Sequence, residues 1–212
     1  RISSVQLFGL NAHLNRPNPN SAANFQFILD TFASKDTVKK ESNLDLRINA
    51  VLIRRGQIHY DLLSAPATPG VFNANHIGIQ NLSATLSLKA FSRDSLNAQI
   101  RRMSFNEQSG FALKKLALKL TANRHHLAAN HIEVALPQTS LRIDTLAAFY
   151  DTLDSLPKLS EQTRYMGKLQ ADITPSDIAP FVPALKHFHS PVTLRMAFKG
   201  QGNHTECTEL YV

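Results

Sequence analysis

Histidines are the residues of this chain whose type best suits metal binding, and there are nine of them. His187 and His189 have the i, i+2 spacing that places two imidazoles on one face of a strand, where they would be good zinc ligands. His125 and His126 are adjacent, so a strand would point them to opposite faces; His131 lies further along the same segment. No carboxylate or thiol completes either group. The sequence therefore predicts no metal site.

Two pairs of acidic residues, Asp172 with Asp177 and Asp151 with Asp154, have spacings that general acid–base chemistry can use. Their surroundings favour structural roles. Asp177 stands at the expected start of a short helix, where a carboxylate satisfies free amide donors. Asp151 and Asp154 fit the wet side of an amphipathic helix expected at 145–156.

The remaining reactive residue is the single cysteine, Cys207, which has no recognisable base beside it. The chain also lacks a glycine-rich phosphate loop, a nucleophile elbow and a histidine pair at metalloprotease spacing. We therefore expect that the protein is not an enzyme and that it has no catalytic residue and no cofactor.

The charge of the chain is mildly basic. Lys and Arg total 23 against 16 Asp and Glu, a formal net charge of +7. No long basic run, zinc-finger spacing, recognition helix or aromatic RNA-binding motif accompanies this excess, so we expect no nucleic-acid partner. The short basic pairs are Lys39-Lys40, Arg54-Arg55, Arg101-Arg102 and Lys114-Lys115.

Alternation of apolar and polar residues dominates the sequence and predicts a mainly β protein. Charged residues make up only 18% of the chain, and its many Asn, Ser and Thr residues suit the wet face of a sheet. Turns recur at short intervals, which favours one antiparallel meander without helical crossovers over residues 1–212. The expected strands cover 8–14, 44–53, 58–62, 77–90, 96–100, 103–105, 116–120, 127–136, 141–143, 169–173 and 192–198.

Three local features accompany these strands. We expect residues 54–57 to form the turn of a hairpin, because Gly56 follows two arginines between two alternating segments. Short helices are expected at 145–156 and at 177–185, the second with Pro175 near its first turn. Residues 24–32 are of uncertain type, and 34–43 are expected to be a polar loop.

An antiparallel sheet of this composition has one apolar face, which something must cover. The sheet either folds on itself as a closed sandwich with an ordinary core, or it forms a curved, partly open groove. An uncovered face of several hundred Å² is unfavourable in water by on the order of 10 kcal/mol, so it needs a ligand or partner. The candidate groove-lining residues are Leu82, Ala84, Leu86, Leu88, Leu116, Leu118, Leu120, Leu194, Met196 and Phe198. The segment at 178–185 is a candidate to cap one end of the groove.

Several segments resemble the AsmA-like proteins, especially the TamB-type translocation and assembly proteins of diderm bacteria. They begin with Leu-Asp-Leu-Arg-Ile-Asn at 44–49 and Gly-Gln-Ile-His-Tyr-Asp at 56–61. In chain order, the others are 72–77, 81–84, 94–97, 107–111, 113–116, 136–144 and 177–185. The resemblance lies in the composition and order of strands over most of the chain.

The resemblance implies a β-taco with a hydrophobic interior, in a long protein that crosses the periplasm from an inner-membrane anchor. Such proteins are implicated in phospholipid transport between the two membranes and in outer-membrane protein assembly. The expected partners are therefore phospholipid acyl chains and outer-membrane assembly proteins. No stretch here reaches the roughly 18 apolar residues of a membrane span, and the sequence begins at Arg1 and ends within an expected strand. We expect it to be a fragment of a membrane-anchored chain.

Two other functions are compatible with these residues. An exposed sheet edge would capture strands of a client protein by β-augmentation. A carbohydrate-binding sandwich or hydrolase would need clustered exposed aromatic residues or paired acids, and the chain has no Trp and only four Tyr.

Overall fold

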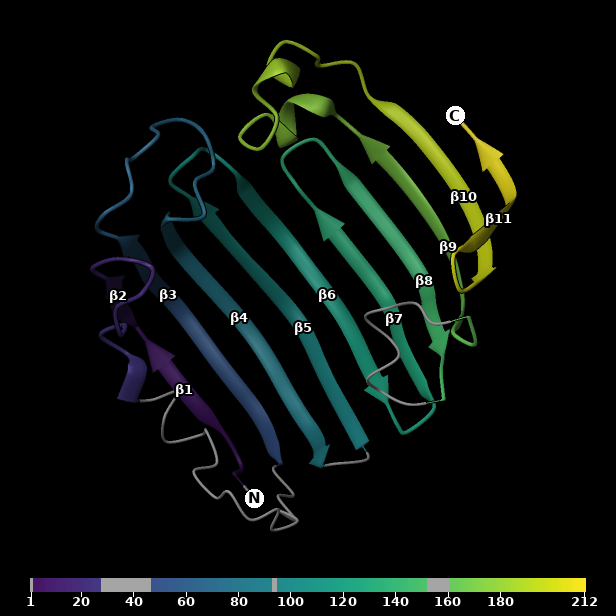
Figure 1. Cartoon of the computed structure of the whole chain (residues 1–212), viewed down its shortest axis with the longest axis horizontal. Helices are drawn as coiled ribbons and strands as arrows, with labels where there is room; N and C mark the ends of the chain where they lie inside the picture. Colours follow the sequence, from purple (N-terminus) through teal and green to yellow (C-terminus); the bar gives the residue numbers. More distant parts are fainter. Residues whose placement is uncertain (1, 28–46, 93–94, 152–160) are drawn as a thin grey trace.

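One sheet of eleven strands makes up most of the protein (Figure 1). The computed structural model describes residues 2–27, 47–92, 95–151 and 161–212. Two short 3-10 helices, η2 and η3, lie in the connection between β9 and β10. The elements are β1 (Val5–Phe8), β2 (Asn11–Arg16), β3 (Ile48–Leu62), β4 (His76–Ser92), β5 (Ser95–Glu107), β6 (Ala112–Ala122), β7 (His126–Ala135), β8 (Ser140–Phe149), β9 (Arg164–Ile173), η2 (Pro175–Ile178), η3 (Pro183–Leu185), β10 (Val192–Gln201) and β11 (His204–Tyr211).

The strand order follows the chain from β3 to β11, and each of these strands is antiparallel to its neighbours. This confirms the expected antiparallel meander for that part of the chain. The first two strands differ, since β1 and β2 both pair with β3 in parallel, one after the other along its edge. A single strand at 8–14 is therefore wrong. Gly9 separates the two strands with a φ of +66°, a conformation that glycine adopts without strain.

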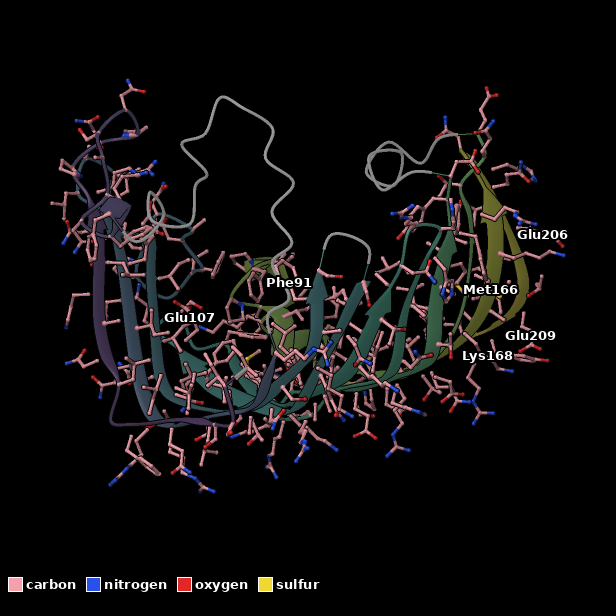
Figure 2. The ribbon with its side chains drawn as sticks, turned by 90° about the horizontal axis from the view of Figure 1, so that it is seen from below. Phe91, Glu107, Met166, Lys168, Glu206 and Glu209 are labelled. Carbon is pink, nitrogen blue, oxygen red and sulfur yellow. The ribbon has the colours of Figure 1, made fainter. Side chains whose placement is uncertain are left out.

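The sheet curves into a trough and stays open. Seen nearly along the strands it has a U-shaped profile, with β1 to β3 in one arm and β9 to β11 in the other (Figure 2). The sheet ends at β1 and β2 on one side and at β11 on the other, and these edges do not pair with each other. The expected curved, open β fold is confirmed, whereas the helix expected at 177–185 is replaced by the two short 3-10 helices η2 and η3. A closed sandwich is wrong, because the described residues form one sheet without a second facing it.

The expected turn at 54–57 is also wrong, because β3 runs through it without a break. Arg55 takes a left-handed φ of +54°, and the register with β4 shifts between Ile53 and Gly56. The extra residue forms a β-bulge, so the strand continues while its apolar–polar alternation shifts by one residue. A second shift lies between Ile48 and Val51.

The helix expected at 145–156 is wrong for its described part, because β8 continues to Phe149. Leu146 pairs with Ala129 of β7, and Ala147 pairs with Ala128. The register with β9 shifts between Ile143 and Leu146, so a bulge interrupts the alternation just where the expected helix begins. Residues 152–156 of the expected helix lie outside the described residues, as do most of the segments considered at 24–32 and 34–43.

Few side chains are fully buried, as expected of a single curved layer. Nine hydrophobic residues are buried among those described, and most other apolar residues of the sheet are half-buried. The described part of the chain contains no helix that is long and apolar enough to cross a membrane.

Candidate functional site

The inner face of the trough is continuously apolar from one side of the sheet to the other. Residues paired across neighbouring strands share a face, so the register traces rows of side chains across the sheet. One row crosses β3 to β10 and consists of Ile53, Ala84, Met103, Leu116, Val134, Leu141, Ala171 and Leu194. A second row crosses β3 to β11 and consists of Ile48, Leu88, Ala98, Leu120, Ala129, Leu146, Gly167, Phe198 and Cys207.

The structure brings all ten sequence-predicted lining residues onto this face. Ala84, Leu88, Leu116, Leu120, Leu194 and Phe198 belong to the two rows above. The other four pair with Gly56, Ile100 or Leu169 on the same face; these four are Leu82, Leu86, Leu118 and Met196.

Some side chains on the inner face remain open to solvent. Phe91 lies inside the U (Figure 2) and is 45% exposed, and Leu146 is 39% exposed. In contrast, Leu82 and Ala84 near the middle of β4 are buried. The floor of the trough is therefore buried near the middle of β4, whereas apolar side chains toward the end of β4 and along β8 are accessible to solvent.

Sequence reasoning did not select the lining residues of β7, β8 and β9. Ile132, Ile143 and Leu169 form a continuous row that leads to Met196 of β10. The alternating pattern was present in each segment. The expected helix at 145–156 overlaps only the second half of β8, whose first half was expected as strand at 141–143.

The outer face is polar and carries most of the charge. One outer row runs Gln99, Lys119, Asn130 and Thr145 across β5 to β8. The ion pairs near the β11 side include Lys168–Glu209 at 3.2 Å and Lys199–Glu206 at 3.3 Å, and their carboxylates point away from the trough (Figure 2). Lys115 pairs with Glu133 on β6 and β7, and this hydrogen bond lowers the pKa of Glu133. Exposed pairs of this kind contribute about 0–1 kcal/mol each.

Four phenylalanines close one end of the trough, and we call them the end cap: Phe72, Phe105, Phe111 and Phe181. The ring centroids of Phe111 and Phe181 are 5.1 Å apart, and those of Phe72 and Phe181 are 4.8 Å apart. Phe105 at the end of β5 lies 6.2 Å from Phe111. The backbone N–H of Phe72 also donates to the carbonyl of Pro180 at 2.8 Å. The segment from η2 to η3 therefore lies at one end of the sheet, with the connection before β4 (Figure 1).

Hydrogen bonds hold this segment against the β7–β8 turn. Thr174 and Thr139 are buried, and the N–H of Thr174 donates to the Thr139 hydroxyl at 2.9 Å. A carboxylate oxygen of Asp177 accepts from the backbone N–H of Gln138 at 2.8 Å. Asp177 thus satisfies an amide donor as expected, but the donor belongs to another loop and not to the short helix itself.

Removing one ring of the end cap is expected to lower stability. Phe181 is 46% exposed, so Phe181→Ala should lower the free energy of unfolding by about 1–2 kcal/mol, less than the 3–5 kcal/mol of a buried phenylalanine. Thermal denaturation measures this change. Phe188→Ala is the control, since Phe188 is 60% exposed and contacts no other ring among the described residues. Equal losses in both variants would show that the cap does not act as a packed cluster.

A histidine–aspartate pair ties down the connection that carries Phe72. The two ring nitrogens of His76 face Oδ1 of Asp61 at 2.8 Å and the carbonyl oxygen of Ala65 at 2.9 Å. Two acceptors favour the doubly protonated ring, so the hydrogen bond to Asp61, followed by that to Ala65, raises the pKa of His76 above its ordinary value of 6.5.

This arrangement predicts a pH dependence. Because the pKa is raised in the folded protein, the pair contributes its full stability below pH 6.5 and loses it as the pH rises through the folded-state pKa. An NMR titration should show a lower pKa for His76 in Asp61→Asn than in the wild type. Asp144→Asn on β8 should leave it unchanged. An unaltered pKa for His76 in Asp61→Asn would contradict the assignment.

The structure places most of the residues considered for chemistry apart from one another. The described residues contain no group of three His, Cys, Asp or Glu side chains placed to hold a metal ion. His189 lies 3.2 Å from the Ser176 hydroxyl, and Asp172 accepts from the Thr193 hydroxyl at 2.8 Å. Cys207 is exposed on β11. Asp154 lies outside the described residues.

Comparison of the chain with protein-family models, with curated proteins and with solved structures finds no match.

Proposed function

We propose that the trough binds the acyl chains of phospholipids and that the protein is a non-enzymatic segment of a lipid-transfer pathway. The observation that carries this proposal is the unbroken apolar inner face across nine strands, with accessible side chains such as Phe91 and Leu146. Monomeric proteins seldom expose apolar areas of this extent without a ligand or partner. Acyl chains match the chemistry of the trough because the two rows across its floor consist almost entirely of aliphatic and aromatic side chains.

The dimensions suit a lipid tail. Strand β4 has 17 residues, which at ~3.4 Å per residue span roughly 55 Å along the trough. The hydrocarbon core of a whole bilayer is about 30 Å thick, so the tails of one leaflet are much shorter than the strand. Phospholipid tails can therefore lie along the strands while head groups remain in water at the open side.

The energetics suit transfer better than permanent storage. Each methylene moved from water onto an apolar surface gains about 0.8 kcal/mol. The same methylene gains little on leaving a bilayer, because one apolar environment replaces another. A lipid can therefore enter and leave the trough without any covalent bond being made or broken.

The resemblance to AsmA-like and TamB-type proteins supports the same role. From this resemblance we infer a periplasmic location in a diderm bacterium, a parent chain anchored in the inner membrane, and outer-membrane assembly proteins as further partners. Both the residues and the resemblance lead to an apolar groove, and the groove is the feature that the lipid proposal requires.

Mass spectrometry of lipids retained after mild purification tests this function. Phospholipid is expected to co-purify with the chain, and a fluorescent phospholipid added to the delipidated protein should bind saturably. Purified chain that retains no lipid and binds no added phospholipid would contradict the proposal.

A second candidate function uses the edge of the sheet. All eight residues of β11 are exposed, so its outer backbone groups are accessible to an added strand. An outer-membrane protein strand captured there would extend the sheet by β-augmentation. Proline within β11 should then abolish client binding, whereas changes to the inner face should leave it intact.

A further inference from the structure

The outer face contains a basic cavity that the trough does not use. Its volume is about 350 Å³, within the size range of small-ligand sites. Its lining residues are Leu52, Ile53, Arg54, Ser83, Ala84, Thr85, Arg102 and Ser104, none of them acidic. The cavity spans β3, β4 and β5 near their middle.

Register places the polar lining residues together on the outer face. Thr85 pairs with both Leu52 and Arg102, and Ser83 pairs with Ser104. These positions alternate with Ala84 and Met103, whose side chains line the trough. Six of the eight lining residues therefore belong to the outer face, and Ile53 and Ala84, which belong to the inner row, lie between them along β3 and β4.

Bulges on all three strands shape this region. The register shifts between Ile53 and Gly56 on β3, between Gln80 and Ser83 on β4, and between Ile100 and Met103 on β5. The residues between these paired positions include the two Arg-Arg pairs of the sequence, Arg54-Arg55 and Arg101-Arg102. Bulges redirect side chains and are enriched next to functional sites. Here they bring two Arg-Arg pairs to the same level of the sheet on either side of β4.

The side-chain donors of the cavity have no partner among the described residues. All four arginines are exposed, and within the described ranges neither Arg54 nor Arg102 forms an ion pair. The hydroxyls of Ser83, Thr85 and Ser104 likewise form no hydrogen bond with another described residue. The cavity thus presents two guanidinium groups and three hydroxyls, with no carboxylate to neutralise them.

We propose that this cavity is a binding site for a phosphate group. Arg54 on β3 and Arg102 on β5 are two strand spacings apart, roughly 10 Å between backbones. Their long side chains can approach an anion from opposite sides, with the hydroxyls of β4 and β5 between them. A tetrahedral phosphate accepts hydrogen bonds from several sides at once, whereas a planar carboxylate is satisfied by one arginine. The phosphate belongs either to a lipid head group or to a free phosphate.

An NMR titration of the full chain with inorganic phosphate at constant ionic strength tests the site. The amides of Ser83, Thr85 and Arg102 are expected to shift saturably. Arg54→Gln/Arg102→Gln should weaken binding by at least about tenfold, which corresponds to 1.4 kcal/mol. Lys114→Gln/Lys119→Gln removes the same charge from exposed positions on β6 outside the cavity, and should change affinity less than about twofold.

Flotation with phosphatidylcholine vesicles, with and without phosphatidic acid, identifies the source of the phosphate. Loss of flotation in the arginine variant alone supports a lipid head group. If the arginine variant floats like the wild type but loses the phosphate-induced amide shifts, the ligand is a free phosphate. If phosphate causes no saturable shift in the wild type, or if the arginine and lysine variants weaken phosphate binding equally, the proposal is overturned. Leu86→Asp/Leu118→Asp should leave the phosphate titration unaltered, which keeps this test separate from that of the trough.

Discussion

Leu86→Asp/Leu118→Asp is expected to reduce retained phospholipid at least about tenfold. Leu86 and Leu118 both pair with Ile100, so the two carboxylates would flank one inner-face residue in the middle of the trough. A lipid tail lying there would have to remove water from both charges without offering a hydrogen bond in return, which is strongly unfavourable. Lipid mass spectrometry and the binding of a fluorescent phospholipid measure the loss.

The matched control places the same charges on the other face of the same sheet. Gln99 on β5 and Thr145 on β8 belong to the outer row and lie outside the basic cavity. Gln99→Asp/Thr145→Asp adds the same two negative charges and should leave lipid retention within about twofold of the wild type. Circular dichroism checks that both double variants remain folded. Equal lipid loss in both, or none in the inner-face variant, would refute binding in the trough.

Gly200→Ala is expected to lower the free energy of unfolding by about 1–3 kcal/mol and to loosen β11. A Cβ atom at Gly200 would lie 2.4 Å from the ring of Tyr165 and 2.6 Å from the carbonyl oxygen of His204. The His204 contact is with backbone and cannot be relieved by rotating a side chain. The Tyr165 hydroxyl also lies 3.3 Å from this carbonyl, so the ring is held over the glycine.

Gly167→Ala provides the comparison for this prediction. A Cβ atom there would meet Phe198 at 2.7 Å and Leu146 at 3.1 Å, and both contacts are with side chains. These side chains face the open trough and can move, so the loss of stability should be smaller. Chemical denaturation measures the two free energies, and hydrogen exchange of the β11 amides measures local opening. A larger effect for Gly167→Ala would contradict the backbone clash at Gly200.

Most strands and all ten lining residues were predictable because alternation reports directly which side of a strand is apolar. The failures occurred at bulges. At Arg55 an extra residue within β3 looked like a turn, and in β8 a bulge between Ile143 and Leu146 interrupts the alternation where a helix was expected to begin. A bulge inserts one residue without ending the strand, and a single strand contains no information about the register of its partner.

The end cap and the basic cavity are two features that local sequence patterns could not predict. Phe72 and Phe181 are far apart in the chain and meet only because the sheet brings the connections before β4 and before β10 to the same end. Arg54 and Arg102 appeared in the sequence as unremarkable basic pairs, and only cross-strand pairing places them around one cavity.

By itself, the sequence determined that this protein is an antiparallel β-sheet with one apolar and one polar face, because the side-chain period of a strand is a local property. Only the tertiary structure decided that the sheet remains a single open layer, that its apolar face is concave, and that one end is capped. These features depend on curvature, bulge positions and contacts between distant connections, which arise from the sum of all strand pairings and not from any one segment.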